Sequence, residues 1–179
     1  MTRIILIYGL VSGTVVILVS MTLIALGGGH HSNVWLGYLV MLVGLSAILV
    51  GVKQHRDQAL GGVIRFWPAF LMGLAIAVVA SLAYVAVWEI YLAATHYAFA
   101  DQYVASILAA KRAAGATGAA YARTVAEMDS FRQIYANPPM RMLETFAEIF
   151  PVGLLIALVS AALLRNPKFL PARSRAAVT

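Results

Sequence analysis

Four long apolar segments dominate this chain and limit what it can fold into. They cover residues 4–26, 34–52, 66–94 and 142–164. A helix needs about 20 residues to cross about 30 Å of hydrocarbon, and irregular backbone cannot cross it because its polar groups would lack hydrogen bonds. Only 11% of the residues are charged, against about 25% in soluble domains. The segments therefore predict an all-α integral membrane four-helix bundle, built as a single membrane domain over residues 1–179.

The first apolar segment has an alternative interpretation as a cleaved signal peptide, because Arg3 precedes it. Its apolar stretch is much longer than the roughly 7–15 residues of a typical signal peptide core. We therefore favour a retained spanning helix.

Residues 95–140 form the sizeable piece of chain outside these segments. Apolar residues recur there at helical spacing in two stretches, and Gly115 and Gly118 lie between the stretches, where a turn is expected. Asn137 followed by Pro138 is a typical helix start, because Asn caps the first turn and Pro has no N–H to leave unpaired. This segment is expected to form a helical hairpin before the fourth span.

The placement of lysine and arginine predicts the orientation, because short cytoplasmic flanks of membrane proteins are enriched in them. With four spans, eight of the 13 cations fall on one side: Arg3, Lys53, Arg56, Arg65, Arg165, Lys168, Arg173 and Arg175. Both termini are therefore expected in the cytoplasm and the hairpin on the extracytoplasmic side. The net charge of +6 is spread over connecting segments, so it does not indicate a nucleic-acid partner.

Small residues recur along each apolar segment at spacings that let helix backbones approach closely. The glycines that carry this pattern are Gly9, Gly13, Gly37, Gly44, Gly73 and Gly153. Close backbone approach drives much of helix association in lipid, where leucine burial contributes little. We expect the stripes to pack the four helices of one chain, although they are also compatible with a homo-oligomer.

Five polar residues near the outer ends of the last two spans form a candidate polar cluster. They are Glu89, His96, Arg141, Glu144 and Glu148. A carboxylate inside a bilayer helix costs about 2.5–3.5 kcal/mol, so such residues usually have a packing or functional reason. Glu144 and Glu148 share a helix face, Arg141 is placed to pair with Glu144, and His96 follows Glu89 by seven residues on the same helix face.

The residues leave several functional hypotheses open. The favoured one is a non-catalytic membrane protein that binds or stabilises a partner, with the glutamates serving as polar packing groups. A proton or cation conduit that uses the intramembrane glutamates is the alternative. No cofactor is predicted, the expected surroundings are the lipid bilayer and a membrane-protein partner or a second copy, and an enzyme is the less favoured class.

A small membrane metalloenzyme is the third hypothesis. Carboxylate and imidazole ligands suit zinc, manganese or iron, and Glu89, His96, Glu144 and Glu148 are weak candidates, to which His30 and His31 could add. Their spacing does not match the Glu-x-x-His pattern of ferritin-like bundles. There is no cysteine, which excludes thiolate ligands and disulfides.

Three blocks of sequence resemble a known family. They are GVKQHRD at 51–57 with GGVIRF at 61–66, WEIY at 88–91, and EIFPVG at 148–153. In this order and spacing the chain is similar to the bacterial family of domains of unknown function numbered 4199, small inner-membrane proteins with four predicted helices and a polar insertion before the last. The resemblance implies a bacterial cytoplasmic membrane location and this architecture, and implies no activity. His55 departs from the pattern, which has an aromatic residue there.

Overall fold

The computed structural model describes residues 1–26 and 34–172. The helices are α1 (Thr2–Leu26), α2 (Val34–Leu45), α3 (Ala47–Ala59), α4 (Phe66–Ala94), α5 (Phe99–Ala113), α6 (Gly118–Ala136) and α7 (Pro138–Leu164), and the described residues include no strand. Four segments are long and apolar enough to cross a membrane: Thr2–Ile24, Trp35–Ala59, Phe66–Ala94 and Pro138–Leu164. The all-α prediction with four membrane-length segments is confirmed.

The second segment consists of two helices that meet at Ser46. The Ser46 hydroxyl donates to the Val43 carbonyl at 2.6 Å, while its backbone N–H still donates to Leu42 at 3.1 Å. Because the backbone hydrogen bonds continue across this residue, α2 and α3 together act as one span. The interruption at Ser46 is local.

Two helix boundaries differ from the sequence expectation by four residues or more. The second segment was expected to end at residue 52, but α3 continues to Ala59. Within this added part of the helix, Lys53 pairs with Asp57, one turn further on. Gly61 and Gly62 follow with φ of 63° and 89°, a conformation that stops a helix. The fourth helix was expected from residue 142 and begins instead at Pro138, directly after the Asn137 cap. In both places charged or polar residues extend a helix beyond its apolar part.

The spanning helices pack through their small residues. A Cβ added to Gly13 would lie 2.1 Å from the Ala80 carbonyl oxygen, and one added to Gly73 would lie 3.0 Å from the Ala157 Cβ. The other glycines with such close interhelical contacts include Gly9, Gly44 and Gly153. Gly37 differs, because an added Cβ there would meet nothing within 4 Å. Five of the six glycines predicted for helix packing therefore lie at contacts within this chain.

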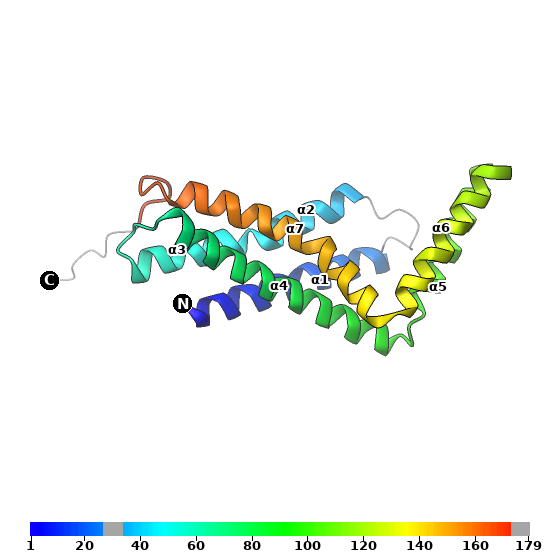
Figure 1. The fold of residues 1–179 in the computed structure, drawn as a ribbon, viewed down its shortest axis with the longest axis horizontal. Coiled ribbons are helices and arrows are strands. Elements are labelled where there is room, and N and C mark those ends of the chain that lie inside the picture. Colours follow the sequence, from blue (N-terminus) through cyan, green and yellow to red (C-terminus); the bar gives the residue numbers. More distant parts are fainter. Residues whose placement is uncertain (27–33, 173–179) are drawn as a thin grey trace.

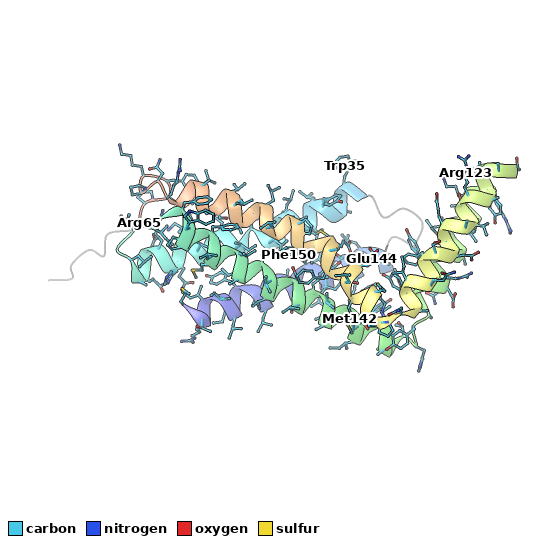
Figure 2. All side chains as sticks on the ribbon, in the orientation of Figure 1. Trp35, Arg65, Arg123, Met142, Glu144 and Phe150 are labelled. Carbon is cyan, nitrogen blue, oxygen red and sulfur yellow. The ribbon has the colours of Figure 1, made fainter. Side chains whose placement is uncertain are left out.

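The hairpin lies at one end of the molecule, and the N-terminus and the end of α7 lie toward the other (Figure 1). α5 and α6 pack against each other and leave the bundle obliquely, and Gly115 and Gly118 between them have φ of 78° and 60°. Figure 2 shows Arg65, in the α3–α4 connection, at one end and Arg123, near the hairpin tip, at the other. The neck of the hairpin, where α4 leads into α5 and α6 leads into α7, is therefore the place where the bundle and the hairpin are joined.

Candidate functional site

The neck of the hairpin holds a buried ion pair between two spanning helices. Arg141 of α7 donates two parallel hydrogen bonds to Glu89 of α4, from Nε to Oε1 at 2.7 Å and from Nη2 to Oε2 at 2.6 Å. The two side chains are only 5% and 15% exposed. Bidentate pairs of this kind combine charge with a fixed orientation. The pair therefore sets the position of α7 relative to α4 at this level.

Arg141 also reaches the hairpin. Its Nη1 donates to the Tyr135 carbonyl at the end of α6, at 2.6 Å, and its guanidinium lies 5.0 Å from the centre of the Tyr97 ring. We refer to Glu89, Arg141, Tyr97 and the Tyr135 carbonyl as the neck cluster. One guanidinium thus connects both spans to both ends of the hairpin.

The turn that presents Tyr97 is held in a costly backbone conformation. His96 and Tyr97 have φ of 52° and 57°, a region that residues other than glycine rarely adopt. Each such residue costs on the order of 1–3 kcal/mol and persists only where its surroundings fix it. Here the Tyr97 N–H donates to the Leu92 carbonyl at 2.8 Å, and the ring covers Arg141. The strain is therefore located at the residue that closes the neck cluster.

Aromatic rings continue this connection into the hairpin. Trp88 of α4 contacts Phe99 of α5 at 4.8 Å between ring centres, and Phe131 contacts Tyr135 within α6 at 4.4 Å. Phe99 and Tyr135 lie 5.9 Å apart and join the two sets. Burial raises the pKa of the Tyr135 phenol to about 12; Trp88 and the positive charge of Arg141 oppose this rise, and the negative charges of Glu148 and Glu89 add to it. The phenol therefore stays protonated at physiological pH.

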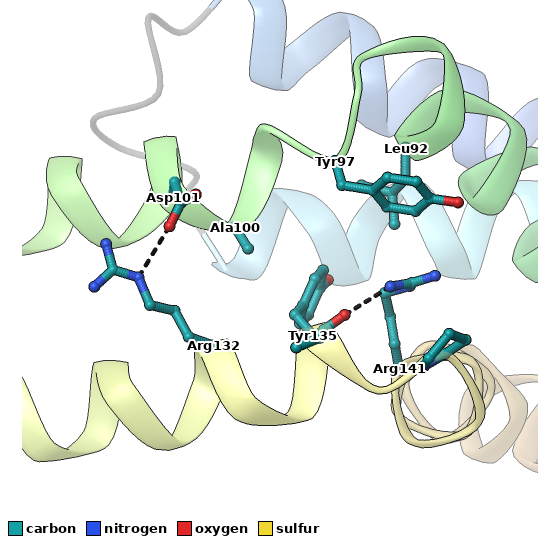
Figure 3. A pocket seen from close by; sticks show the side chains of 9 residues that line it. Leu92, Tyr97, Ala100, Asp101, Arg132, Tyr135 and Arg141 are labelled. Carbon is teal, nitrogen blue, oxygen red and sulfur yellow. Dashed lines mark hydrogen bonds and ion pairs between the residues drawn. The ribbon is translucent and has the colours of Figure 1, made fainter.

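An open cavity of about 570 Å³ lies between the two hairpin helices at the neck. Its polar lining comes from Tyr97, Asp101, Arg132 and Arg141, and the apolar part includes Leu92 and Pro138. Figure 3 shows the Asp101–Arg132 pair on one side of this neck cavity and Tyr97 with Arg141 on the other. Arg132 Nε donates to Asp101 Oδ1 at 3.0 Å, and both side chains are exposed.

No contact among the described residues joins the three glutamates directly. Glu89 pairs with Arg141, whereas the side chains of Glu144 and Glu148 are exposed on α7, and Glu148 acts on the neck through the effect of its charge on Tyr135. The buried face of α7 runs through Thr145 and Ile149. Glu144 instead borders a smaller hollow of about 280 Å³ whose other lining residues are Ile134, Met140, Leu143 and Ala147. Arg141 was expected to pair with Glu144, but it pairs instead with Glu89 of the neighbouring helix α4.

His96 does not share a helix face with Glu89, because α4 ends at Ala94 and His96 lies exposed in the following turn. The weak metal set of Glu89, His96, Glu144 and Glu148 is therefore not assembled. Within residues 1–26 and 34–172, no group of three or more acidic or histidine side chains is placed to hold a metal ion. His30 and His31 lie outside the described residues.

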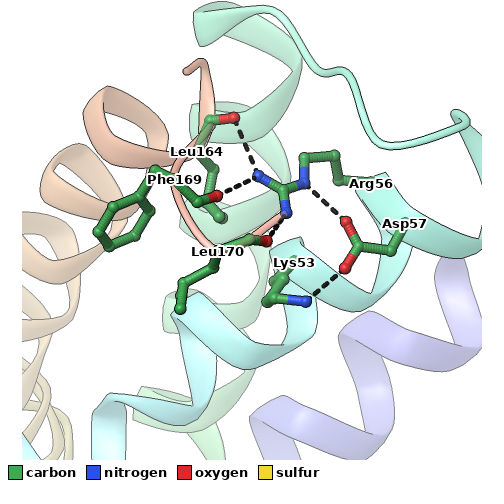
Figure 4. Close-up of polar contacts among 6 residues, drawn as sticks. All are labelled: Lys53, Arg56, Asp57, Leu164, Phe169 and Leu170. Atoms are coloured by element: carbon green, nitrogen blue, oxygen red, sulfur yellow. Dashed lines mark hydrogen bonds and ion pairs between the residues drawn. The ribbon is translucent and has the colours of Figure 1, made fainter. Parts of the chain in front are cut away.

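A second buried arginine, Arg56, lies at the other end of the bundle and was not singled out from the sequence. Its side chain is fully buried. Nε donates to Asp57 at 2.7 Å, and the two Nη atoms donate to the carbonyls of Leu164, Phe169 and Leu170 (Figure 4).

We refer to Lys53, Arg56, Asp57 and these three carbonyls as the tail cluster. Carbonyls at the end of a helix lack partners within the helix, and Arg56 supplies donors to the end of α7 and the residues after it. Asp57 accepts from Arg56 through one carboxylate oxygen and from Lys53 through the other. The four-residue spacing of Lys53 and Asp57 was the available signal that the helix continues here.

Comparison with family models identifies the chain. The model described as "Protein of unknown function (DUF4199)" matches residues 7–166. Comparisons with the curated proteins and with the solved structures find no match. The matched range contains most of the first membrane-length segment, the other three in full, the hairpin and the neck cluster. The chain therefore belongs to the DUF4199 family.

Proposed function

We propose that this protein is a non-catalytic membrane protein whose bundle holds the α5–α6 hairpin in a fixed position for binding or stabilising a partner. The observation that carries the proposal is the neck cluster. Its guanidinium and carboxylate are already committed to each other and to the Tyr135 carbonyl. Such a mutually neutralised pair suits a structural connection better than acid–base chemistry, which requires a group that can exchange protons.

The expected depth of the neck cluster in the membrane supports this role. About 20 residues cross the hydrocarbon, and counting back along α7 from Leu164 reaches the neighbourhood of Thr145. Arg141 therefore lies just beyond the hydrocarbon, among the headgroups. A connection at this level fixes the direction in which the hairpin leaves the membrane.

The proposed location is a bacterial cytoplasmic membrane, with both termini in the cytoplasm and the hairpin outside. Support comes from the positive-inside distribution. Arg65 lies near the end of the bundle that also carries the N-terminus (Figures 1 and 2), and the ends of α3 and α7, next to Lys53 and Arg165, lie at the same end. Arg56 is buried in the tail cluster but lies at this same end.

The partner role can be tested with a photo-crosslinking amino acid placed at Ala109 on the exposed surface of α5, with Leu155 on the exposed surface of α7 as the matched position. We expect a discrete protein adduct from position 109 in native membranes and none from position 155. The adduct should weaken in Glu89→Gln and persist in Glu144→Gln. Equal adducts from both positions, or an adduct from position 109 that is unchanged in Glu89→Gln, would exclude the proposal that the bundle holds the hairpin in position for binding a partner.

A proton or cation conduit remains the second candidate, because Glu148 lies on an exposed face about three residues inside the hydrocarbon by the same count. In the described bundle the buried hydroxyls of Ser12, Ser81 and Thr145 donate to carbonyls of their own helices, which does not favour a relay through one chain. Ion flux into vesicles containing the purified protein decides between the two. Flux that disappears in Glu148→Gln would favour the conduit, and the binding role predicts none above empty vesicles.

A further inference from the structure

The neck cavity lies on the hairpin side of the segments that are long and apolar enough to cross a membrane. It is bordered by Leu92, near the end of α4, and by Pro138, the first residue of α7. Both helices are candidate spans that end at this level. Because Pro138 lies about seven residues beyond Thr145, where the hydrocarbon ends by the count from Leu164, the cavity opens outside the hydrocarbon, within reach of lipid headgroups.

The rim of the cavity carries one charge of each sign. Asp101 and Arg132 are 77% and 46% exposed and are joined by the 3.0 Å contact. Exposed pairs of this kind are weak, so they open at little cost. A simple anion would meet Asp101 and also Asp129, whose carboxylate lies 3.8 Å from Arg132. A simple cation would meet Arg132 and Arg141. The charges are complementary to a group that carries both signs.

The inner wall of the cavity adds donors and aromatic surfaces. Arg141 uses three of its five N–H groups in the neck cluster, so two remain to donate to a further acceptor. The rings of Tyr97 and Tyr135 also border the cavity, and aromatic faces attract ammonium groups. The wall therefore suits an oxyanion beside Arg141 and an ammonium group near the rings.

We propose that the neck cavity binds a phosphoethanolamine group as the headgroup of a membrane lipid. Its phosphate accepts hydrogen bonds from Arg132 and from the remaining donors of Arg141. Its primary ammonium donates to Asp101, replacing the exposed Asp101–Arg132 pair. This site does not depend on the partner-binding role, because it requires only the neck of the hairpin.

The test is native mass spectrometry of the full chain in mild detergent, with phosphatidylethanolamine, phosphatidylcholine or phosphatidylglycerol added at equal concentration. Phosphatidylcholine has no N–H to donate to Asp101, and phosphatidylglycerol has no ammonium group. We expect phosphatidylethanolamine to be retained about tenfold better than either, the factor that one charge-assisted hydrogen bond supplies.

Asp101→Asn and Arg132→Gln should each remove this preference. The matched controls are Glu127→Gln and Arg123→Gln, exposed α6 residues that do not line the cavity, and they should keep it. Adding soluble phosphoethanolamine to the lipid-bound protein distinguishes a lipid headgroup from a free compound as the ligand. If the lipid is retained, the ligand is a membrane lipid; if the lipid is displaced, the same site binds a soluble compound. Equal retention of the three lipids, or cavity variants that behave like the controls, would overturn the proposal.

Discussion

Two buried arginines carry the charge inside the described part of this protein. Arg141 and Arg56 are the charged residues among the buried side chains of residues 1–26 and 34–172, and they lie at opposite ends of the bundle. Each binds one carboxylate and at least one backbone carbonyl. Removing one partner of such a pair leaves a buried charge without compensation, which costs far more than an exposed pair contributes.

Glu89→Gln should therefore destabilise the protein strongly. The amide keeps the shape but cannot neutralise Arg141, and we expect a loss on the order of 3 kcal/mol, seen as a lower melting temperature in detergent. Glu144→Gln is the control and should melt close to wild type, because Glu144 is exposed. The double variant Glu89→Gln/Arg141→Gln should recover part of the loss, since no charge is then left unpaired. Similar melting of the two single variants would contradict the structural role of the pair.

Arg56→Gln should release the chain that follows α7. Four hydrogen bonds from Arg56 reach Asp57 and the carbonyls of Leu164, Phe169 and Leu170, and a glutamine cannot replace them. Limited proteolysis followed by mass analysis should show faster cleavage near Lys168 than in wild type. Arg65→Gln, an exposed cation in the α3–α4 connection, should leave the cleavage rate unchanged. An equal increase in the cleavage rate of Arg65→Gln would show that the loss of a positive charge, and not the loss of the Arg56 hydrogen bonds, causes the faster cleavage.

At the scale of elements, α4 organises the bundle, because it packs against α1 on one side and α7 on the other. Its residues Ala69, Gly73, Ala77 and Ser81 repeat every fourth position and are all buried. Small side chains allow the neighbouring backbones to approach, and van der Waals contact at this short range holds helices together in lipid.

Gly13→Ala should disrupt the α1–α4 contact. The new Cβ would lie 2.1 Å from the Ala80 carbonyl oxygen, and this backbone atom cannot move aside without shifting a helix. Overpacking of this kind costs about 1–3 kcal/mol or more, which a melting experiment in detergent would detect. Gly37→Ala is the matched control and should be neutral, because nothing lies within 4 Å of its added Cβ. Equal changes in melting temperature for the two substitutions would show that helix propensity, not packing, determines their effect on stability.

The sequence predicted elements better than it predicted partners. Apolar length located the four segments, and Gly115, Gly118 and Asn137 marked the hairpin turn and the start of α7. Pattern alone could not show that Arg141 binds Glu89, because that choice depends on how α4 and α7 face each other. It also missed Arg56, because a charged residue after an apolar run resembles a loop cation until α3 is seen to continue to Ala59.

At the scale of the whole molecule, the four segments place the N-terminus and the end of α7 together and the hairpin opposite (Figure 1). Fusions of alkaline phosphatase test which side is which, because the enzyme is active only outside the cytoplasm. We expect an active fusion at Gly115 and an inactive one after Arg173. The reverse pattern would place the hairpin in the cytoplasm and contradict the positive-inside orientation.

The central claim is that the Glu89–Arg141 pair holds the hairpin in a fixed direction relative to the bundle. The chain has no cysteine, so spin labels can be placed at Ala122 of α6 and Leu155 of α7 without background, and electron–electron double resonance gives the distribution of distances between them. We predict one narrow distribution in the parent protein and in Glu144→Gln, and a broad one in Glu89→Gln. A distribution that stays equally narrow in Glu89→Gln would show that the pair does not hold the hairpin.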